Sequence, residues 1–212
     1  MHWNTVTPVL RDVLGKLMQS KIFQPFRLVG GTSLSLQFGH RESVDIDLFT
    51  DAAYDSIDFD QIRAYFHAEY SFVSSNEGLP VALGSSWYIG PTSNDAVKID
   101  LYYTDPFIRP HQLLDGVRMA AVEDIIAMKL DVIGRGGRMK DFWDIHLLHE
   151  HFPIKKMIAL YQERYPYGFT SKELKKGLVD FEMAENDLMP NCLLGKHWPL
   201  IKLDFINWLQ KN

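Results

Sequence analysis

The stretch that decides the fold is GGTSLSLQFGHRESVDIDLF, residues 30–49, in which a glycine turn and a short helix lead into an apolar strand. Asp45 and Asp47 are two residues apart on that strand, and side chains at this spacing point to the same face. The apolar residues that alternate with them are expected to face the core: Val44, Ile46 and Leu48. Because like charges on one buried face repel each other, the pair indicates a cation between them.

A later strand offers a third carboxylate. The run AVKIDLYY, residues 96–103, carries Asp100 in phase with Lys98. Mg2+ prefers oxygen ligands and usually keeps water and substrate phosphates in its shell. A D-x-D pair alone is weak evidence, because most such pairs lie on surface strands or in turns. Together with a third aspartate and the glycine turn, the pair favours a metal site.

The glycine turn predicts a phosphate-binding helix start. Backbone N–H groups after Gly30 and Gly31, with the hydroxyl of Thr32 or Ser33, are free to hold phosphate oxygens. The pattern matches neither G-x-x-x-x-G-K-[ST] nor G-x-G-x-x-G, so it supports neither a P-loop nor a dinucleotide-binding site. The alternative is a tight strand-to-helix turn that requires a positive φ.

The predicted elements change in character near residues 105–118. Helical spacing of apolar residues predicts helices over 7–19, 32–39, 58–70, 121–134, 140–152, 154–166 and 198–210. Apolar, β-rich runs predict strands over 26–31, 43–49, 70–75, 79–90 and 96–104. The fold class is therefore α+β, a mixed sheet flanked by helices. We expect a core of residues 1–108, followed by a mostly helical region, residues 109–212, that completes the active site.

Composition places the chain among ordinary globular proteins. It has 212 residues, 46% of them hydrophobic, and a net charge of -5, so the total charge does not favour non-specific attraction to long nucleic acid. Cys192 is the only cysteine, which excludes an internal disulfide and favours a reducing compartment. The N-terminus lacks a signal-peptide pattern, and no stretch approaches 18 apolar residues. We expect a cytoplasmic protein without a membrane partner.

Three segments together carry a family resemblance. They are GGTSLSLQFGHRESVDIDLF, VKIDLYY and AVEDIIAMKLDVIGRGGRMKDFWDIHLL. Roughly over residues 20–150, the chain resembles the AbiEii/AbiGii toxin family of nucleotidyltransferases. This family belongs to the DNA polymerase β-like nucleotidyltransferase superfamily. Residues 151–212 match the family only in being helical.

The resemblance implies a role for each matching position. Gly31 and Thr32 stand at the pair that holds the triphosphate, and Asp45 and Asp47 stand at the metal-binding D-x-D. The residues at the later motifs are Lys98 and Asp100 in the second, Asp124 and Lys129 in the third, and Asp144 in the last, with Asp141 as its rival. We therefore expect Asp45, Asp47 and Asp100 to bind metal. We expect Lys129 to contact nucleotide phosphates, and Asp144 to orient the site.

The implied reaction is attack of a hydroxyl on the α-phosphate of a nucleoside triphosphate, with pyrophosphate leaving. We expect two Mg2+ ions, with Mn2+ as the alternative, since two metals can activate the attacking oxygen and stabilise the leaving one. The expected acceptor is RNA, at the 3′ end of tRNA, and the expected partner is an antitoxin encoded nearby. The alternatives are a small-molecule acceptor, a protein acceptor, or a nucleotide-binding homologue without turnover.

Three basic or histidine-rich stretches remain to be interpreted. Residues 134–140, GRGGRMK, are either a loop that contacts phosphates of the triphosphate or of RNA, or a solvated turn between helices. Arg41 can reach substrate phosphates, whereas the neighbouring His40 is more typical of a loop hydrogen bond. The run HLLHEH, residues 146–151, lacks H-E-x-x-H spacing and does not predict a zinc site.

Overall fold

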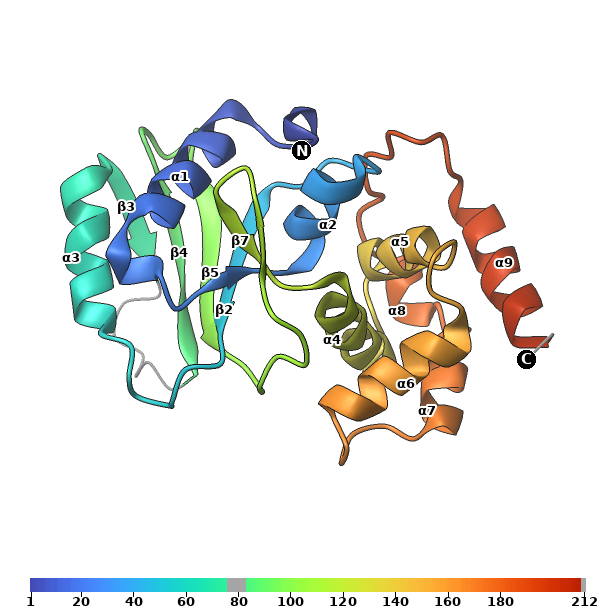
Figure 1. Ribbon diagram of the computed structural model, residues 1–212. Coiled ribbons are helices and arrows are strands. Elements are labelled where there is room, and N and C mark those ends of the chain that lie inside the picture. Colours follow the sequence, from blue (N-terminus) through green and yellow to red (C-terminus); the bar gives the residue numbers. More distant parts are fainter. Residues whose placement is uncertain (76–82, 211–212) are drawn as a thin grey trace.

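The computed structural model describes residues 1–75 and 83–210, in which a seven-stranded mixed sheet adjoins a group of helices (Figure 1). The strands lie in the order β3-β4-β5-β2-β1-β7-β6. Their bounds are β1 Arg27–Leu28, β2 Asp45–Thr50, β3 Phe72–Ser75, β4 Gly84–Gly90, β5 Val97–Tyr103, β6 Gln112–Leu114 and β7 Val117–Met119. The expected α+β fold class is confirmed.

The strand pairing brings two predicted site segments together. Strands β2 and β5 run parallel, with Asp45 opposite Lys98 and Asp47 opposite Asp100. Strand β4 pairs antiparallel with β5 on its other side. Parallel neighbours need a long connection, and here the chain passes through a helix and two strands between β2 and β5. Residues about fifty positions apart in sequence thus become neighbours in the sheet.

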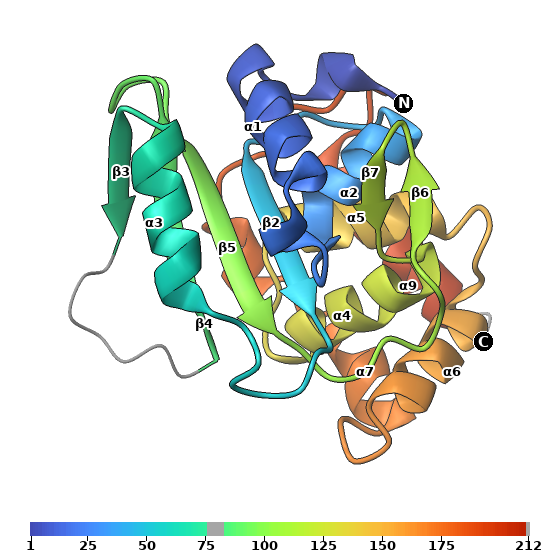
Figure 2. The ribbon, with the colours of Figure 1, turned by 60° about the vertical axis from the view of Figure 1, so that its left-hand side comes forward.

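Helices cover both faces of the sheet. Figure 2 shows α1 (Pro8–Gln19) and α3 (Phe59–Glu69) in front of it, where they form one apolar core with Ile46 and Leu48 of β2. A second apolar core lies on the other face and is built mainly by α4 (Val122–Gly134), α5 (Met139–Leu148) and α6 (Ile154–Arg164). Since side chains alternate along a strand, Asp45 and Asp47 point to this second face.

The remaining elements connect or cap these layers. They are the short 3-10 turns Trp3–Thr5 and Lys21–Phe23 and the helices α2 (Gly30–Phe38), α7 (Ser171–Gly177), α8 (Glu182–Glu185) and α9 (Trp198–Gln210). Helix α2 ends where Gly39 adopts a left-handed conformation, with φ of 67°. This conformation costs glycine little, and it explains why the predicted helix stops there.

Most predicted helices and strands are present, with several differences. Val44 was expected in the core but is 64% exposed, because β2 begins one residue later, at Asp45. Of the strand expected over residues 79–90, positions 79–82 lie outside the described residues and the rest contains β4. The hairpin of β6 and β7 was not predicted. It adds two strands to the sheet, the second of which ends at Met119. The division at residue 108 stays a prediction.

Candidate active site

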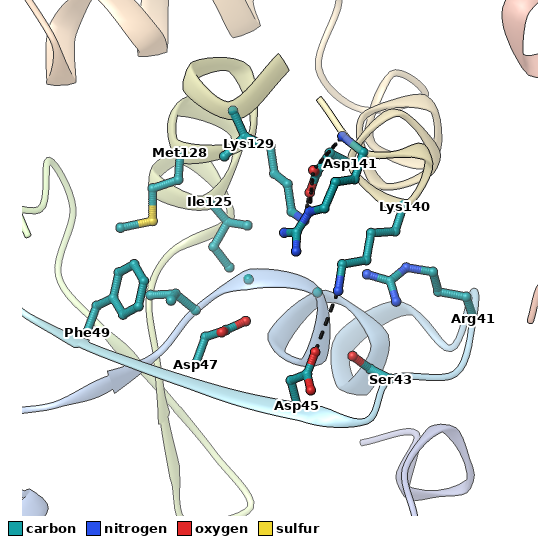
Figure 3. Close-up of a pocket in the computed structure, with 15 residues that line it drawn as sticks. Arg41, Ser43, Asp45, Asp47, Phe49, Ile125, Met128, Lys129, Lys140 and Asp141 are labelled. Carbon is teal, nitrogen blue, oxygen red and sulfur yellow. Dashed lines mark hydrogen bonds and ion pairs between the residues drawn. The ribbon is translucent and has the colours of Figure 1, made fainter. Parts of the chain in front are cut away.

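A pocket lies between β2, the start of α2, helix α4 and the start of α5 (Figure 3). One side of it is apolar and consists of Val29, Phe49, Ile125, Met128 and Val132. The other side is polar and consists of Gly30, Gly31, Arg41, Ser43, Asp45, Asp47, Lys129, Arg138, Lys140 and Asp141. Segments from residues 29 to 141 therefore converge on one cavity whose two walls differ in polarity.

Asp45 and Asp47 both face this pocket, as their spacing predicted. Burial, followed by the charge of Asp100, raises the pKa of Asp47 to about 6. Within residues 1–75 and 83–210, no hydrogen bond or ion pair reaches the Asp47 carboxylate. Asp45 forms an ion pair with the Lys140 ammonium at 3.6 Å. The pocket therefore holds two carboxylates whose negative charge the protein compensates only in part.

The glycine turn fits closely around this pair. Gly30 has φ of 67°, and a Cβ built there would overlap the carboxylate of Asp47. A Cβ at Gly31 would overlap the guanidinium of Arg41. Both glycines are thus required by close approach of a charged side chain, and the first also by its backbone conformation. The first turn of α2, whose N–H groups have no partner within the helix, starts at the pocket.

The donor set fits a divalent cation that substrate completes. No group of three or more His, Cys, Asp or Glu side chains in the described part of the chain is arranged to hold a metal ion. Asp45 and Asp47 are nevertheless a pair of oxygen donors that face the pocket. Mg2+ is commonly bound by one or two carboxylates together with substrate phosphates. Asp100, which lies opposite Asp47 in the sheet, stays a predicted third ligand.

Behind the pocket lies a buried network of charges. Arg41 donates from Nε and Nη2 to the two carboxylate oxygens of Asp144, at 2.7 and 2.9 Å. Lys129 donates to Asp141 at 2.5 Å and lies 2.9 Å from Asp144. His40 contacts the same Asp144 carboxylate at 2.8 Å. Two cations and two carboxylates are thus paired out of contact with water.

The pKa values show how strongly these charges depend on each other. Burial would raise the pKa of Asp144, but Arg41 and Lys129 hold it well below its usual value. Burial would likewise lower the pKa of Lys129, yet Asp141 and Asp144 outweigh burial and raise it. The pKa of His40 is lowered, mainly by burial. The imidazole is therefore neutral near pH 7, and the network stays charged and paired.

The predicted site residues fall into two groups. The pocket is lined by Gly30, Gly31, Arg41, Asp45, Asp47 and Lys129. The others have partners elsewhere: Thr32 with Ser43 and the Asp45 carbonyl, Ser33 with Gln37, Lys98 with Asp100, Asp100 also with Ser86, and Asp144 with Arg41. Their assignment to nucleotide binding or catalysis stays a prediction.

Asp124 illustrates the second group. Its carboxylate is fully buried and accepts hydrogen bonds from the backbone N–H groups of Ile108 and Arg109 at 2.8 and 3.1 Å. It also pairs with Arg164 at 2.7 Å. Arg164 in turn donates to the carbonyl oxygens of Asp105 and Pro106. Asp124 thus ties α4 and α6 to the segment that follows β5.

Three polar pocket residues were not assigned to the site from the sequence. Lys140 and Arg138 belong to the GRGGRMK run, for which a solvated turn remained an alternative; both line the pocket. Ser43 lines it as well, and its hydroxyl lies 2.8 Å from that of Thr32. The sequence signal for the two cations was their place in the basic, glycine-rich run GRGGRMK. Ser43 carried no signal beyond its nearness to Asp45.

Lys140 lines the pocket beside Asp45, and its replacement tests whether it contacts the nucleotide. We expect Lys140→Ala to raise the KM for nucleotide about tenfold, the scale for losing one charged hydrogen bond. The free energy of unfolding should change by less than about 1 kcal/mol, because the pair with Asp45 is partly exposed and 3.6 Å long.

Arg135→Ala is the matched control for Lys140→Ala. Arg135 lies at the C-terminal end of α4 and pairs with Asp131, but it is outside the pocket lining. Steady-state kinetics with labelled nucleotide would provide the two KM values. An equal change in both variants, or no change in either, would contradict a specific role for Lys140.

Comparison with known proteins places the chain in a family. A family model described as nucleotidyl transferase AbiEii toxin, type IV toxin–antitoxin system, matches residues 12–191. The chain belongs to this family. An uncharacterized protein of Aquifex aeolicus (strain VF5) is 29% identical over 186 residues, which cover 84% of each chain.

Solved structures agree on the fold of this AbiEii family member. MenT4, a nucleotidyltransferase toxin of Mycobacterium tuberculosis H37Rv, aligns with a TM-score of 0.60 at 13% identity, over 96% of this chain and 84% of that one. JHP933 from Helicobacter pylori aligns with a TM-score of 0.58 at 17% identity, over 95% and 88% of the two chains. The expected nucleotidyltransferase fold is therefore confirmed.

Family membership confirms three further expectations in their general form. The protein is a nucleotidyltransferase of a type IV toxin–antitoxin family, so a nucleoside triphosphate is its substrate and an antitoxin its partner. Enzymes of this class generally use divalent metal ions, which agrees with the carboxylate pair. In residues 1–75 and 83–210, none of the helices is long and apolar enough to cross a membrane.

Proposed function

We propose that this protein transfers a nucleoside monophosphate from a triphosphate to a hydroxyl of RNA, at the 3′ end of tRNA, with Mg2+ as the metal. Such an acceptor places the enzyme in the cytoplasm. The observation that carries the proposal is the pocket itself. Asp45 and Asp47 line it together with Lys129, Arg138 and Lys140. Carboxylate oxygens and cations that line one cavity suit a triphosphate with its metal.

Each wall of the pocket has a separate task in this proposal. Asp45 and Asp47, with Asp100, would hold the divalent cations, which supply charge stabilisation to the attacking and leaving oxygens. Lys140 and Arg138 are exposed enough to contact the triphosphate, since their side chains are 32% and 56% exposed. In reactions of this type, positioning and charge stabilisation contribute most of the rate.

The buried charges have a supporting role. Lys129 lines the pocket, but its ammonium is held by Asp141 and Asp144 and is only 5% exposed. Its charge acts on the pocket across a short distance, and Asp144 fixes Arg41 beside the glycine turn. The apolar wall, which includes Phe49 and Met128, offers a surface for the nucleobase. The phosphates then lie against the polar wall.

Incubation of the protein with total cellular RNA, Mg2+ and each α-32P-labelled triphosphate in turn tests the proposal. We expect label in a tRNA-sized band with one or two of the nucleotides, and none with an Asp45→Ala, Asp47→Ala double variant. Label on protein would keep the reaction and replace the acceptor. With no label anywhere, titration with a non-hydrolysable triphosphate would separate a protein that binds nucleotide from one that does not.

A further inference from the structure

Ser86 lies on β4 beside Asp100, outside all segments that carried the family resemblance. The antiparallel register places the two residues directly opposite each other. The Ser86 hydroxyl lies 2.6 Å from Asp100 Oδ1 and 3.0 Å from the Tyr102 hydroxyl. The ring of Tyr102 in turn meets Phe49 of the pocket edge-on, with centroids 6.0 Å apart. A short polar chain therefore runs from the edge of the pocket to the carboxylate.

The direction of these hydrogen bonds follows from donor counts. An ionised carboxylate only accepts hydrogen bonds, and a serine hydroxyl has a single proton to donate. Ser86 must therefore donate to Asp100, and the Tyr102 hydroxyl must donate to Ser86. Such a chain is cooperative, because each bond polarises the next. Tyr102 thereby fixes the direction in which Ser86 points its proton.

Lys98 completes the fixation of the carboxylate. Its ammonium donates to Asp100 Oδ2 at 2.5 Å, so one donor contacts each oxygen. Two bonds to two oxygens fix both the position and the plane of the group. A carboxylate has about four acceptor sites, so one remains free on each oxygen. Asp100 is thus held in place and still able to bind a cation.

We propose that Ser86 is a positioning residue that orients Asp100 for metal binding in the nucleotidyl transfer reaction. This proposal rests on the proposed function, because Asp100 must act as a ligand there. Groups that orient metal ligands typically affect metal affinity or activity by about 10- to 100-fold. We therefore expect Ser86→Ala to weaken Mn2+ binding about 10- to 100-fold and Ser86→Thr, which keeps the hydroxyl, to retain most of the affinity.

Ser85 supplies a matched control one position earlier on the same strand. Because side chains alternate along a strand, Ser85 points to the opposite face of the sheet, toward α1 and α3. Mn2+ titration of the wild type, Ser85→Ala, Ser86→Ala and Ser86→Thr, followed by electron paramagnetic resonance with a non-hydrolysable triphosphate present, measures the affinity without turnover. Tyr102→Phe should weaken binding by a smaller factor, since Lys98 and Ser86 both remain.

The outcomes separate this proposal from the proposed function. Equal Mn2+ affinity in Ser86→Ala and Ser85→Ala would overturn the role of Ser86, whether or not RNA becomes labelled. Absence of Mn2+ binding in the wild type would overturn it too. Selective loss in Ser86→Ala, with recovery in Ser86→Thr, would support it even if the acceptor proves to be a protein or a small molecule. Labelling of RNA tests the proposed function alone.

Discussion

Asp47→Asn should lower nucleotidyl transfer by roughly 10²–10³-fold, the scale for losing one preorganised charged group in a site. The same change should make the metal-free protein more stable. Asp47 is half-buried in the pocket beside Asp100 and Asp45, and its pKa is raised to about 6. Asparagine removes that charge while keeping the shape of the side chain. Activity and stability therefore change in opposite directions.

The sign of the stability effect follows from proton binding. The pKa of Asp47 in the folded protein, about 6, lies above the usual aspartate value of 3.8, so the folded state binds this proton more tightly. The cost of ionisation develops as pH rises from 3.8 to 6 and is complete above pH 6. At pH 7.5 the gain in Asp47→Asn should be about 1–3 kcal/mol, and near pH 4 it should vanish.

Denaturant unfolding in EDTA at both pH values, beside labelled-nucleotide assays with Mg2+, measures the two effects. Asp60→Asn is a suitable control, since Asp60 is 86% exposed and lies on α3, away from the pocket. Loss of stability at pH 7.5 in Asp47→Asn would contradict the charge-repulsion account. Full activity in that variant would remove Asp47 from the metal site.

Local sequence patterns were enough to predict which residues of the single segment 30–49 face the pocket. Alternation along β2 placed Asp45 and Asp47 on one face, and the glycine turn required no distant information. Arg41 lies in the pocket, yet its bonds to Asp144 join residues 103 positions apart. Such a pairing depends on how α5 packs against α2, which no local pattern contains. The sequence therefore indicated that a charged site exists, without indicating which charges are paired.

Asp124 and Ser86 show the same limit of sequence-based prediction, because their partners are set by packing and strand register. Asp124 and Lys129 are five residues apart on α4, which does not suit an i,i+4 salt bridge, and the two side chains join separate networks. The partner of the first, Arg164, is 40 residues away on another helix. Ser86 faces Asp100 only because β4 pairs with β5 in one particular register, and a slip of one residue would point it to the opposite face.

Asp144→Ala should produce the largest loss of stability among the charged residues of the site. Asp144 is fully buried and holds Arg41, Lys129 and His40. Its removal leaves two buried cations with Asp141 as their remaining carboxylate within the network. Breaking a buried ion pair in this way costs about 3–5 kcal/mol, because the other charge stays desolvated and unpaired. For a domain of this size, the melting temperature should fall by roughly 6–20 °C.

Asp204→Ala is the control, because Asp204 also contacts a histidine at 2.8 Å but its side chain is 46% exposed. It should cost less than about 1 kcal/mol. A double change, Arg41→Met with Asp144→Leu, keeps the Lys129–Asp141 pair and replaces the other two charges by apolar groups. It should recover much of the stability, as apolar replacement of buried ion pairs often does.

Transfer activity of these variants, measured below their melting temperatures, separates folding from chemistry. The apolar double variant lacks the guanidinium that packs against Gly31, so we expect it to be stable and still impaired in nucleotide binding. Full activity in that variant would show that Arg41 and Asp144 serve the fold alone. The free energy of unfolding of Asp144→Ala could instead stay within 1 kcal/mol of the wild-type value. That result would mean that the charges at this site are solvated in solution. Burial could then not be the property that links the charge network to the pocket.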